Sequence, residues 1–200
     1  MSKTEWPYIT PGMPDHLFKR AGGIAMTKQE IRLIVLGKLR LFPGAVVYDV
    51  GAGTGSVTVE CARLVKPGTV YALEQDAAAD ELVETNVRRF GLSNVKLVPG
   101  RAPATMAKLP AADRIFIGGS NGALTDILQA AHRKLKPGGW LAATAVTLET
   151  GPLVMRFLIE QGYQQAEAVS VTVAVARQAG ESHLWQGHNP VLIISGQKPV

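Results

Sequence analysis

Three glycines alternate with other residues in the segment Asp49-Val-Gly-Ala-Gly-Thr-Gly55, which directly follows a short apolar run. Glycine has no Cβ and tolerates positive φ angles, so a turn of this kind lets a ligand approach the backbone closely. A dinucleotide-binding turn would carry its last glycine one position later, and a phosphate-binding P-loop would continue into Gly-Lys-Ser/Thr, which is absent here. The spacing therefore predicts a ligand-binding turn that is neither a dinucleotide-binding turn nor a P-loop.

Glu74 closes the next apolar run of the chain, nineteen residues after Gly55. In a doubly wound parallel sheet, the end of the second strand lies beside the turn that follows the first strand. A carboxylate at that place can accept hydrogen bonds from both hydroxyls of a ribose. The turn and Glu74 together predict a nucleoside site that does not require a pyrophosphate.

Apolar runs alternate with helical patterns along most of the chain, and these elements would position the turn and Glu74. We expect helices over 57–65, 77–90, 123–135 and 153–161, and strands over 45–50, 69–74, 94–98, 114–117, 140–147, 167–175 and 190–195. This alternation predicts an α/β protein with a Rossmann-like, doubly wound, mostly parallel seven-stranded sheet. The last two strands are joined by a loop over 176–189 without a helix, which predicts an antiparallel C-terminal strand.

The N-terminal part of the chain differs from the rest. Residues 1–26 are rich in Pro and Gly and should be irregular, whereas Thr27-Lys-Gln-Glu30 has the pattern of a capping box at a helix start. We expect a single domain over 1–200. Within it, 1–44 would form a cap segment and helix, 45–147 the ligand-binding core, and 148–200 a C-terminal helix and strands on the substrate side.

The formal net charge of +5 is concentrated near the N-terminus, because residues 1–44 hold seven Lys/Arg and three Asp/Glu. Such a bias favours an anionic ligand. The chain has no run of five like charges and no basic ladder with interleaved aromatic residues, which weakens a nucleic-acid-binding interpretation.

Cysteine and histidine usage indicates neither disulfides nor a metal site. Cys61 is the single cysteine, so no internal disulfide can form, and its apolar neighbours predict a buried thiol in a cytoplasmic protein. No apolar stretch approaches the roughly 20 residues that span a bilayer, which argues against a membrane protein. We expect no metal, because the histidines lack metal-ligand spacing: His16, His132, His183 and His188.

The glycine turn and Glu74 resemble those of the class I methyltransferases, which bind S-adenosylmethionine, over roughly 45–147. More narrowly, the chain resembles the CbiT family of corrin biosynthesis, the decarboxylating C-15 methyltransferases of the cobalamin pathway. The segments that carry the narrower resemblance run almost from end to end: Gly12-Met-Pro-Asp15, Met26-Thr-Lys28, Asp49-Val-Gly-Ala-Gly-Thr-Gly-Ser-Val-Thr-Val-Glu60, Gly100-Arg-Ala-Pro103, Phe116-Ile-Gly-Gly-Ser120 and Asn189-Pro-Val191.

The resemblance implies S-adenosylmethionine as the cofactor and an anionic tetrapyrrole, a late precorrin with or without cobalt, as the substrate. The residues implied to bind the cofactor are Thr27, Gly51, Ala52, Gly53, Thr54, Gly55, Glu74 and Ala102. Many class I enzymes carry an acid at the position of Arg101, so backbone groups would recognise the adenine here. No catalytic residue is assigned.

A substrate site is expected beside the cofactor, at the end of the fourth predicted strand. Its candidate residues are Lys28, Gly118, Gly119, Ser120 and Asn121, because two glycines would admit a flat macrocycle close to the backbone. Lys19, Arg20 and Arg32 are further candidates for pairing with substrate carboxylates.

Two other functions stay open on the sequence alone. The positive charge and the shared turn also fit a class I methyltransferase acting on tRNA, and a non-catalytic S-adenosylmethionine-binding subunit would carry the same turn. Trp185, in the loop over 176–189, is an anchor candidate for an interface, so we expect a homo-oligomer, with a tetramer as one candidate assembly.

Overall fold

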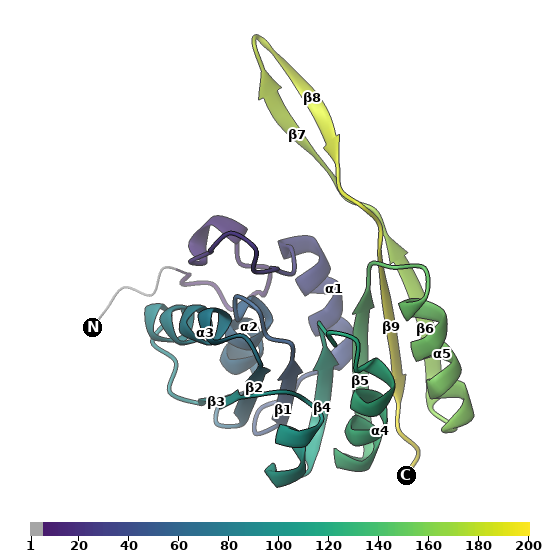
Figure 1. The fold of residues 1–200 in the computed structure, drawn as a ribbon. Coiled ribbons are helices and arrows are strands. Elements are labelled where there is room, and N and C mark those ends of the chain that lie inside the picture. The colour runs from purple at the N-terminus through teal and green to yellow at the C-terminus, as the bar shows by residue number, and fades with distance from the viewer. Residues whose placement is uncertain (1–5) are drawn as a thin grey trace.

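The computed structural model describes residues 6–200, so the first five residues of the predicted irregular segment lie outside the described part of the chain. The described residues form a seven-stranded sheet with helices on both faces and a separate two-stranded sheet (Figure 1). The strand order in the large sheet is β3-β2-β1-β4-β5-β9-β6. Its strands are β1 (Val46–Val50), β2 (Thr69–Glu74), β3 (Val95–Pro99), β4 (Ala112–Ile117), β5 (Leu135–Ala145), β6 (Gln164–Val171) and β9 (Val191–Gln197).

Strands β1 to β5 pair in parallel, and β9 pairs antiparallel with both β5 and β6. The strand order reverses between β2-β1 and β4, which places a ligand-binding crevice at the carboxyl ends of β1 and β4. The predicted fold class, a doubly wound and mostly parallel sheet with an antiparallel C-terminal strand, is confirmed.

Helices cover the sheet according to the alternation of its buried side chains. Val47 and Phe116 face a core shared with the first two helices, whereas Tyr48 and Ile115 face the core beneath the fourth and fifth helices. The helices are α1 (Gln29–Leu39), α2 (Ser56–Val65), α3 (Ala77–Arg89), α4 (Leu124–Lys134) and α5 (Thr150–Glu160), with short 3-10 helices η1 (Asp15–Leu17) and η2 (Ala104–Lys108). Within residues 6–200, no helix is long and apolar enough to cross a bilayer.

Two local predictions are wrong. Helix α1 begins at Gln29 with Lys28 as its N-cap and has no side-chain cap bond, so no capping box forms. The helix thus begins one residue later than the pattern requires, and the carbonyl of Thr27 accepts a hydrogen bond from the side chain of Arg32. The strand predicted over 140–147 starts too late, because β5 begins at Leu135, where the chain already pairs with Ala112 and then with the residue that follows β9.

The predicted loop over 176–189 is also wrong, because most of it forms a hairpin of β7 (Ala174–Ala179) and β8 (Ser182–Gly187). This arm projects away from the body of the protein (Figure 1). Its two-residue turn begins at Gly180, which has the positive φ (+64°) that hairpin turns require. The alternation was hard to read from sequence, because every residue of β8 is exposed and no face of the arm is apolar throughout.

Candidate functional site

A cavity of about 430 Å³ lies at the carboxyl ends of the central strands. Its walls come from the turn after β1, the end of β2, the turns after β3 and β4, and a segment before α1. The structure thus brings most of the sequence-predicted site residues into one wall: Thr27, Gly51, Ala52, Gly53, Glu74, Ala102, Gly118, Gly119, Ser120 and Asn121. This size lies within the usual range for small-molecule sites, roughly 300–1,000 Å³.

The glycine turn has no room for side chains at two of its positions. Gly51 has a φ of +75°, and a Cβ there would lie 2.7 Å from backbone atoms of Gly119. Gly53 has a φ of +56°, and a Cβ there would lie 2.6 Å from the carbonyl oxygen of Ala25. Both positions therefore need glycine for conformation and for close approach of neighbouring backbone. The result is a cavity floor made of backbone.

Glu74 connects strand β2 to this turn. Its Oε2 accepts a hydrogen bond from the Gly53 N–H at 2.9 Å, and its Oε1 accepts from the N–H groups of Gln75 (2.8 Å) and Asp76 (3.1 Å). A carboxylate offers about four lone-pair sites, so Oε2 keeps one for a ligand hydroxyl. Glu74 is therefore held in place by backbone hydrogen bonds and can still accept a hydrogen bond from a ligand.

Negative charge accumulates around the cavity. Glu74 and Asp76 line it, and Asp49 is fully buried in β1, just before the turn. Burial, together with the charge of Glu74, raises the pKa of Asp49 to about 6, although Thr58 Oγ1 donates a hydrogen bond to Asp49 Oδ2 at 2.5 Å. A cavity with this surrounding charge favours a ligand that carries positive charge.

The turn after β4 forms the wall opposite Glu74. The N–H of Gly118 donates to the carbonyl of Val50 at 2.9 Å, which fixes the turn against β1. From the turn after β3, Arg101 Nη2 donates to the carbonyl of Asn121 at 3.5 Å. Basic charge thus lies between the two turns.

Three of the residues predicted to bind the cofactor or to form the substrate site beside it lie outside the cavity wall. Thr54 is buried behind the turn, and Gly55 faces Val83 of α3, where a Cβ would be 3.0 Å from the Val83 backbone. Lys28 follows Thr27, and its Nζ lies 3.6 Å from Asp15 Oδ2 with its side chain about one-third exposed (37%). Lys28 therefore stands next to the wall without forming part of it.

One prediction about substrate binding is wrong. Arg32 is not available to a substrate carboxylate, because its side chain has no exposed surface and pairs with Glu60 of α2. The sequence placed Arg32 among basic residues of an N-terminal segment and could not show that a buried carboxylate faces it. Lys19 and Arg20 of the same segment are exposed.

The model of the precorrin methyltransferase domain family matches residues 16–198 of the chain. The chain belongs to the precorrin methyltransferase family. A relative from Pyrobaculum calidifontis, named a probable cobalt-precorrin-6B C(15)-methyltransferase (decarboxylating), is 43% identical over 95% of this chain and 97% of its own. The cobalt-precorrin-6B C(15)-methyltransferase (decarboxylating) of Salmonella typhi is 36% identical over 93% of this chain and 96% of its own.

A solved precorrin methyltransferase has the same fold. The crystal structure of precorrin-6y C5,15-methyltransferase from Geobacter metallireducens has a TM-score of 0.89 and 39% identity, covering 96% of this chain and 100% of that chain. The cofactor of this class of enzyme is S-adenosylmethionine, as the sequence predicted. The cavity fits it, since Gly51 and Gly53 add no Cβ atoms to the floor, Glu74 can accept a hydrogen bond from a hydroxyl, and the surrounding carboxylates favour a sulfonium.

The cavity wall of this precorrin methyltransferase also contains residues that the sequence did not indicate. Gly23, Ile24 and Ala25 reach it from the N-terminal segment, which lies over the glycine turn. The only local signal was the pair Gly22-Gly23, and nothing in it indicates which part of the sheet the segment covers. Among residues 6–200, no cluster of three or more metal-ligating side chains occurs.

Proposed function

We propose that this chain transfers the methyl group of S-adenosylmethionine to C-15 of cobalt-precorrin-6B and removes the carboxyl group of an acetate side chain as carbon dioxide. The observation that carries the proposal is the coincidence of an end-to-end match to precorrin methyltransferases with a backbone-floored cavity at the strand ends. The same activity stands in the names of relatives that cover nearly the whole chain.

When bound, S-adenosylmethionine supplies an electrophilic methyl group on a sulfonium. We assign the backbone of Gly51, Ala52 and Gly53 to the methionine and ribose portions, Glu74 to a ribose hydroxyl, and the backbone of Ala102 to the adenine. Thr27 closes the same cavity from the N-terminal side, and Thr54 and Gly55 shape the turn from behind. The main contribution of these groups is alignment and exclusion of water, because an electron-rich carbon needs little acid–base help to attack a sulfonium.

The substrate would lie against the turn after β4. Gly118 and Gly119 carry no side chain there, so a flat conjugated ring can approach the backbone, and Ser120 and Asn121 offer polar groups at its edge. Lys28 is partly exposed beside Thr27 and can pair with a substrate carboxylate. The conjugated ring itself can accept the electron pair that the departing carboxylate leaves behind.

The activity is tested by incubating the protein with methyl-labelled cofactor and cobalt-precorrin-6B, its metal-free analogue or unmodified tRNA. We expect label in the tetrapyrrole together with release of carbon dioxide in equal amount. Label in tRNA alone would favour the tRNA methyltransferase that the sequence left open. Cofactor binding without label in any substrate would favour a non-catalytic subunit.

We also propose that the protein is a homo-oligomer assembled through the β7–β8 arm, with a tetramer as one candidate assembly. Leu184 and Trp185 on the arm are 63% and 78% exposed. An isolated two-stranded hairpin is only marginally stable in water, so an arm of this length is better explained if another copy of the chain covers it. We place the enzyme in the cytoplasm, since its lone cysteine, Cys61, is a free buried thiol.

A further inference from the structure

Two charged side chains that no part of the proposed reaction uses are buried beside the cavity. Arg32 of α1 and Glu60 of α2 are 0% and 2% exposed, and Arg32 Nε donates to Glu60 Oε1 at 2.8 Å. Buried ion pairs often stabilise a fold no better than apolar residues of similar volume would. Their contacts therefore need an explanation other than stability.

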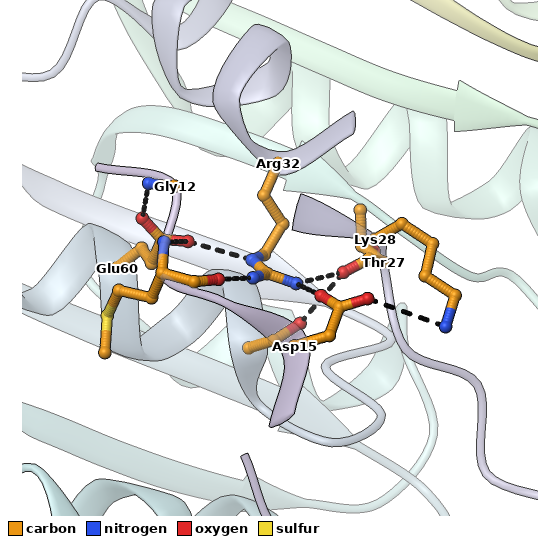
Figure 2. A network of polar contacts seen from close by, with 8 residues as sticks. Gly12, Asp15, Thr27, Lys28, Arg32 and Glu60 are labelled. Atoms are coloured by element: carbon orange, nitrogen blue, oxygen red, sulfur yellow. Dashed lines mark hydrogen bonds and ion pairs between the residues drawn. The ribbon is translucent and has the colours of Figure 1, made fainter. Parts of the chain in front are cut away.

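Arg32 binds one continuous segment of the chain at three places (Figure 2). We call residues 12–28 the strap. The guanidinium donates to the carbonyl of Met13, to Asp15 Oδ1 at 2.8 Å and to the carbonyl of Thr27 at 2.5 Å. Only the planar fork of arginine presents enough donors in fixed directions to reach all of these acceptors and Glu60 together.

Glu60 holds the beginning of the strap from the other side. Its carboxylate accepts a hydrogen bond from the N–H of Gly12, drawn in Figure 2, and another from the N–H of Met13. The N···O distances are 2.6 Å and 3.2 Å. The Arg32–Glu60 pair is thus bonded to both ends of the strap. It fixes the strap to the two helices that follow it in sequence.

The strap lies directly on the glycine turn. Four of its residues line the cavity: Gly23, Ile24, Ala25 and Thr27. The carbonyl of Ala25 approaches Gly53 so closely that a Cβ on Gly53 would be 2.6 Å away. Displacement of the strap would therefore remove one wall of the cavity while the sheet and its helices stayed in place.

We propose that Arg32 is a positioning residue, which holds the strap as a wall of the cofactor cavity and, through Asp15, holds Lys28 beside that wall. Asp15 carries this second link, because its Oδ1 accepts from Arg32 and its Oδ2 lies 3.6 Å from Lys28 Nζ. The proposal rests on the assignment of this cavity to S-adenosylmethionine.

The test variant is Arg32→Lys, which keeps one charge beside Glu60 but loses the fork. We expect the dissociation constant for S-adenosylmethionine, measured by calorimetry, to rise about tenfold. This is the increase that results if the strap is in its binding position in only about one-tenth of the unliganded molecules. Tryptic cleavage after the exposed Lys19 and Arg20 should become faster, and saturating cofactor should slow it again. The turnover number at saturating cofactor should stay within about threefold of the wild-type value, because the wall re-forms when the cavity is filled.

Arg63→Met is the matched control. Arg63 of α2 donates to the carbonyls of Trp6 and Tyr8, so its removal loosens the chain just before the strap without touching the cavity wall. Cofactor affinity should be unchanged in this variant. Asp15→Asn gives a second reading if Arg32→Lys does not fold, since Asp15 is partly exposed and its replacement leaves Glu60 paired; we expect a smaller loss of affinity and the same faster cleavage.

The possible outcomes separate this proposal from the proposed function. A folded Arg32→Lys or Asp15→Asn protein with wild-type affinity and wild-type cleavage would overturn the positioning role, even if its melting temperature had dropped. A wild-type protein that does not bind S-adenosylmethionine would overturn the function itself. Equal weakening in Arg63→Met would show that any loosening of the N-terminal chain has the same effect, and it would also contradict the role of Arg32.

Discussion

Glu74 Oε2 accepts a hydrogen bond from the N–H of Gly53 at 2.9 Å, so the end of strand β2 is joined to the middle of the glycine turn. The glycine turn and Glu74, which the sequence shows as two separate features, therefore form one structural unit. The carboxylate fixes the turn in the conformation that leaves the cavity floor bare, and it keeps a lone pair for a ligand. Changes at either residue should affect the same cavity.

Replacement of Glu74 should weaken cofactor binding without unfolding the protein. Glu74→Ala removes the acceptor for a ribose hydroxyl and leaves the N–H of Gly53 without its partner. A lost hydrogen bond to a charged group costs about 1.5–3 kcal/mol, which corresponds to a 10- to 150-fold higher dissociation constant. Calorimetry with S-adenosylmethionine measures this directly. Glu84→Ala, an exposed carboxylate on α3, is the control, and equal affinity in both variants would remove Glu74 from the site.

A methyl group on Gly53 should push the strap away from the glycine turn and disrupt the cavity wall, because it would meet the carbonyl of Ala25. We expect Gly53→Ala to abolish measurable cofactor binding while the far-UV circular dichroism spectrum stays native. The variant also forces a non-glycine residue to a φ of +56°, which costs about 1–2 kcal/mol of folding stability.

Gly91→Ala separates the two effects of that change. Gly91 has a φ of +61°, but a Cβ there would meet nothing within 4 Å. It should therefore lose similar stability in urea denaturation and keep its cofactor affinity. If Gly91→Ala lost binding as fully as Gly53→Ala, backbone strain rather than close approach would be the cause.

The core of the site was predictable from sequence because its determinants are local. The glycine spacing, the position of Glu74 and the alternation of strands and helices each need only a short stretch of chain to be read. Parallel pairing then brings the carboxyl ends of β1, β2 and β4 together. The cavity wall around Gly51, Glu74 and Gly118 could therefore be predicted from the order of strands and helices along the chain. The buried position of Cys61 was confirmed as well.

The strap and the arm could not be read in the same way. Arg32 appears in the sequence as one cation in a basic segment, and only the fold shows that Glu60, twenty-eight residues later, is buried against it. The capping-box pattern at Thr27 failed because the helix begins one residue later than the pattern requires, with Lys28 as its N-cap. Most strands are identified in a sequence by the alternation that produces one apolar face, and the arm has no such face. The division of the chain into cap segment, core and substrate-side part stays a prediction.

The exposed arm should control the oligomeric state. Trp185→Glu places a charge where the proposed contact between copies would bury an aromatic ring, so the assembly should dissociate into smaller species in sedimentation velocity. Ile159→Glu on α5 is the control, since Ile159 is similarly exposed (64%) but lies outside the arm. Wild-type protein that sediments as a monomer would contradict the proposed assembly before any variant is made.

Asp49 should make the stability of the protein depend on pH in a definite direction. Burial raises its pKa from 3.8 to about 6. Between these values the folded protein keeps a proton that the unfolded chain has lost, so the free energy of unfolding falls as the pH rises through this window and is independent of Asp49 above about pH 6. Asp49→Asn cannot ionise. Relative to wild type, it should therefore gain roughly 2 kcal/mol of stability between pH 4 and pH 7, measured by urea denaturation across that range.

Asp126→Asn is the control, because Asp126 lies at an exposed position in the first turn of α4; its stability relative to wild type should not change between pH 4 and pH 7. If the stability difference between Asp49→Asn and wild type were constant over this range, the Asp49 carboxyl would be ionised in the folded protein over the whole range. The hydrogen bond from Thr58 would then compensate for the burial of Asp49.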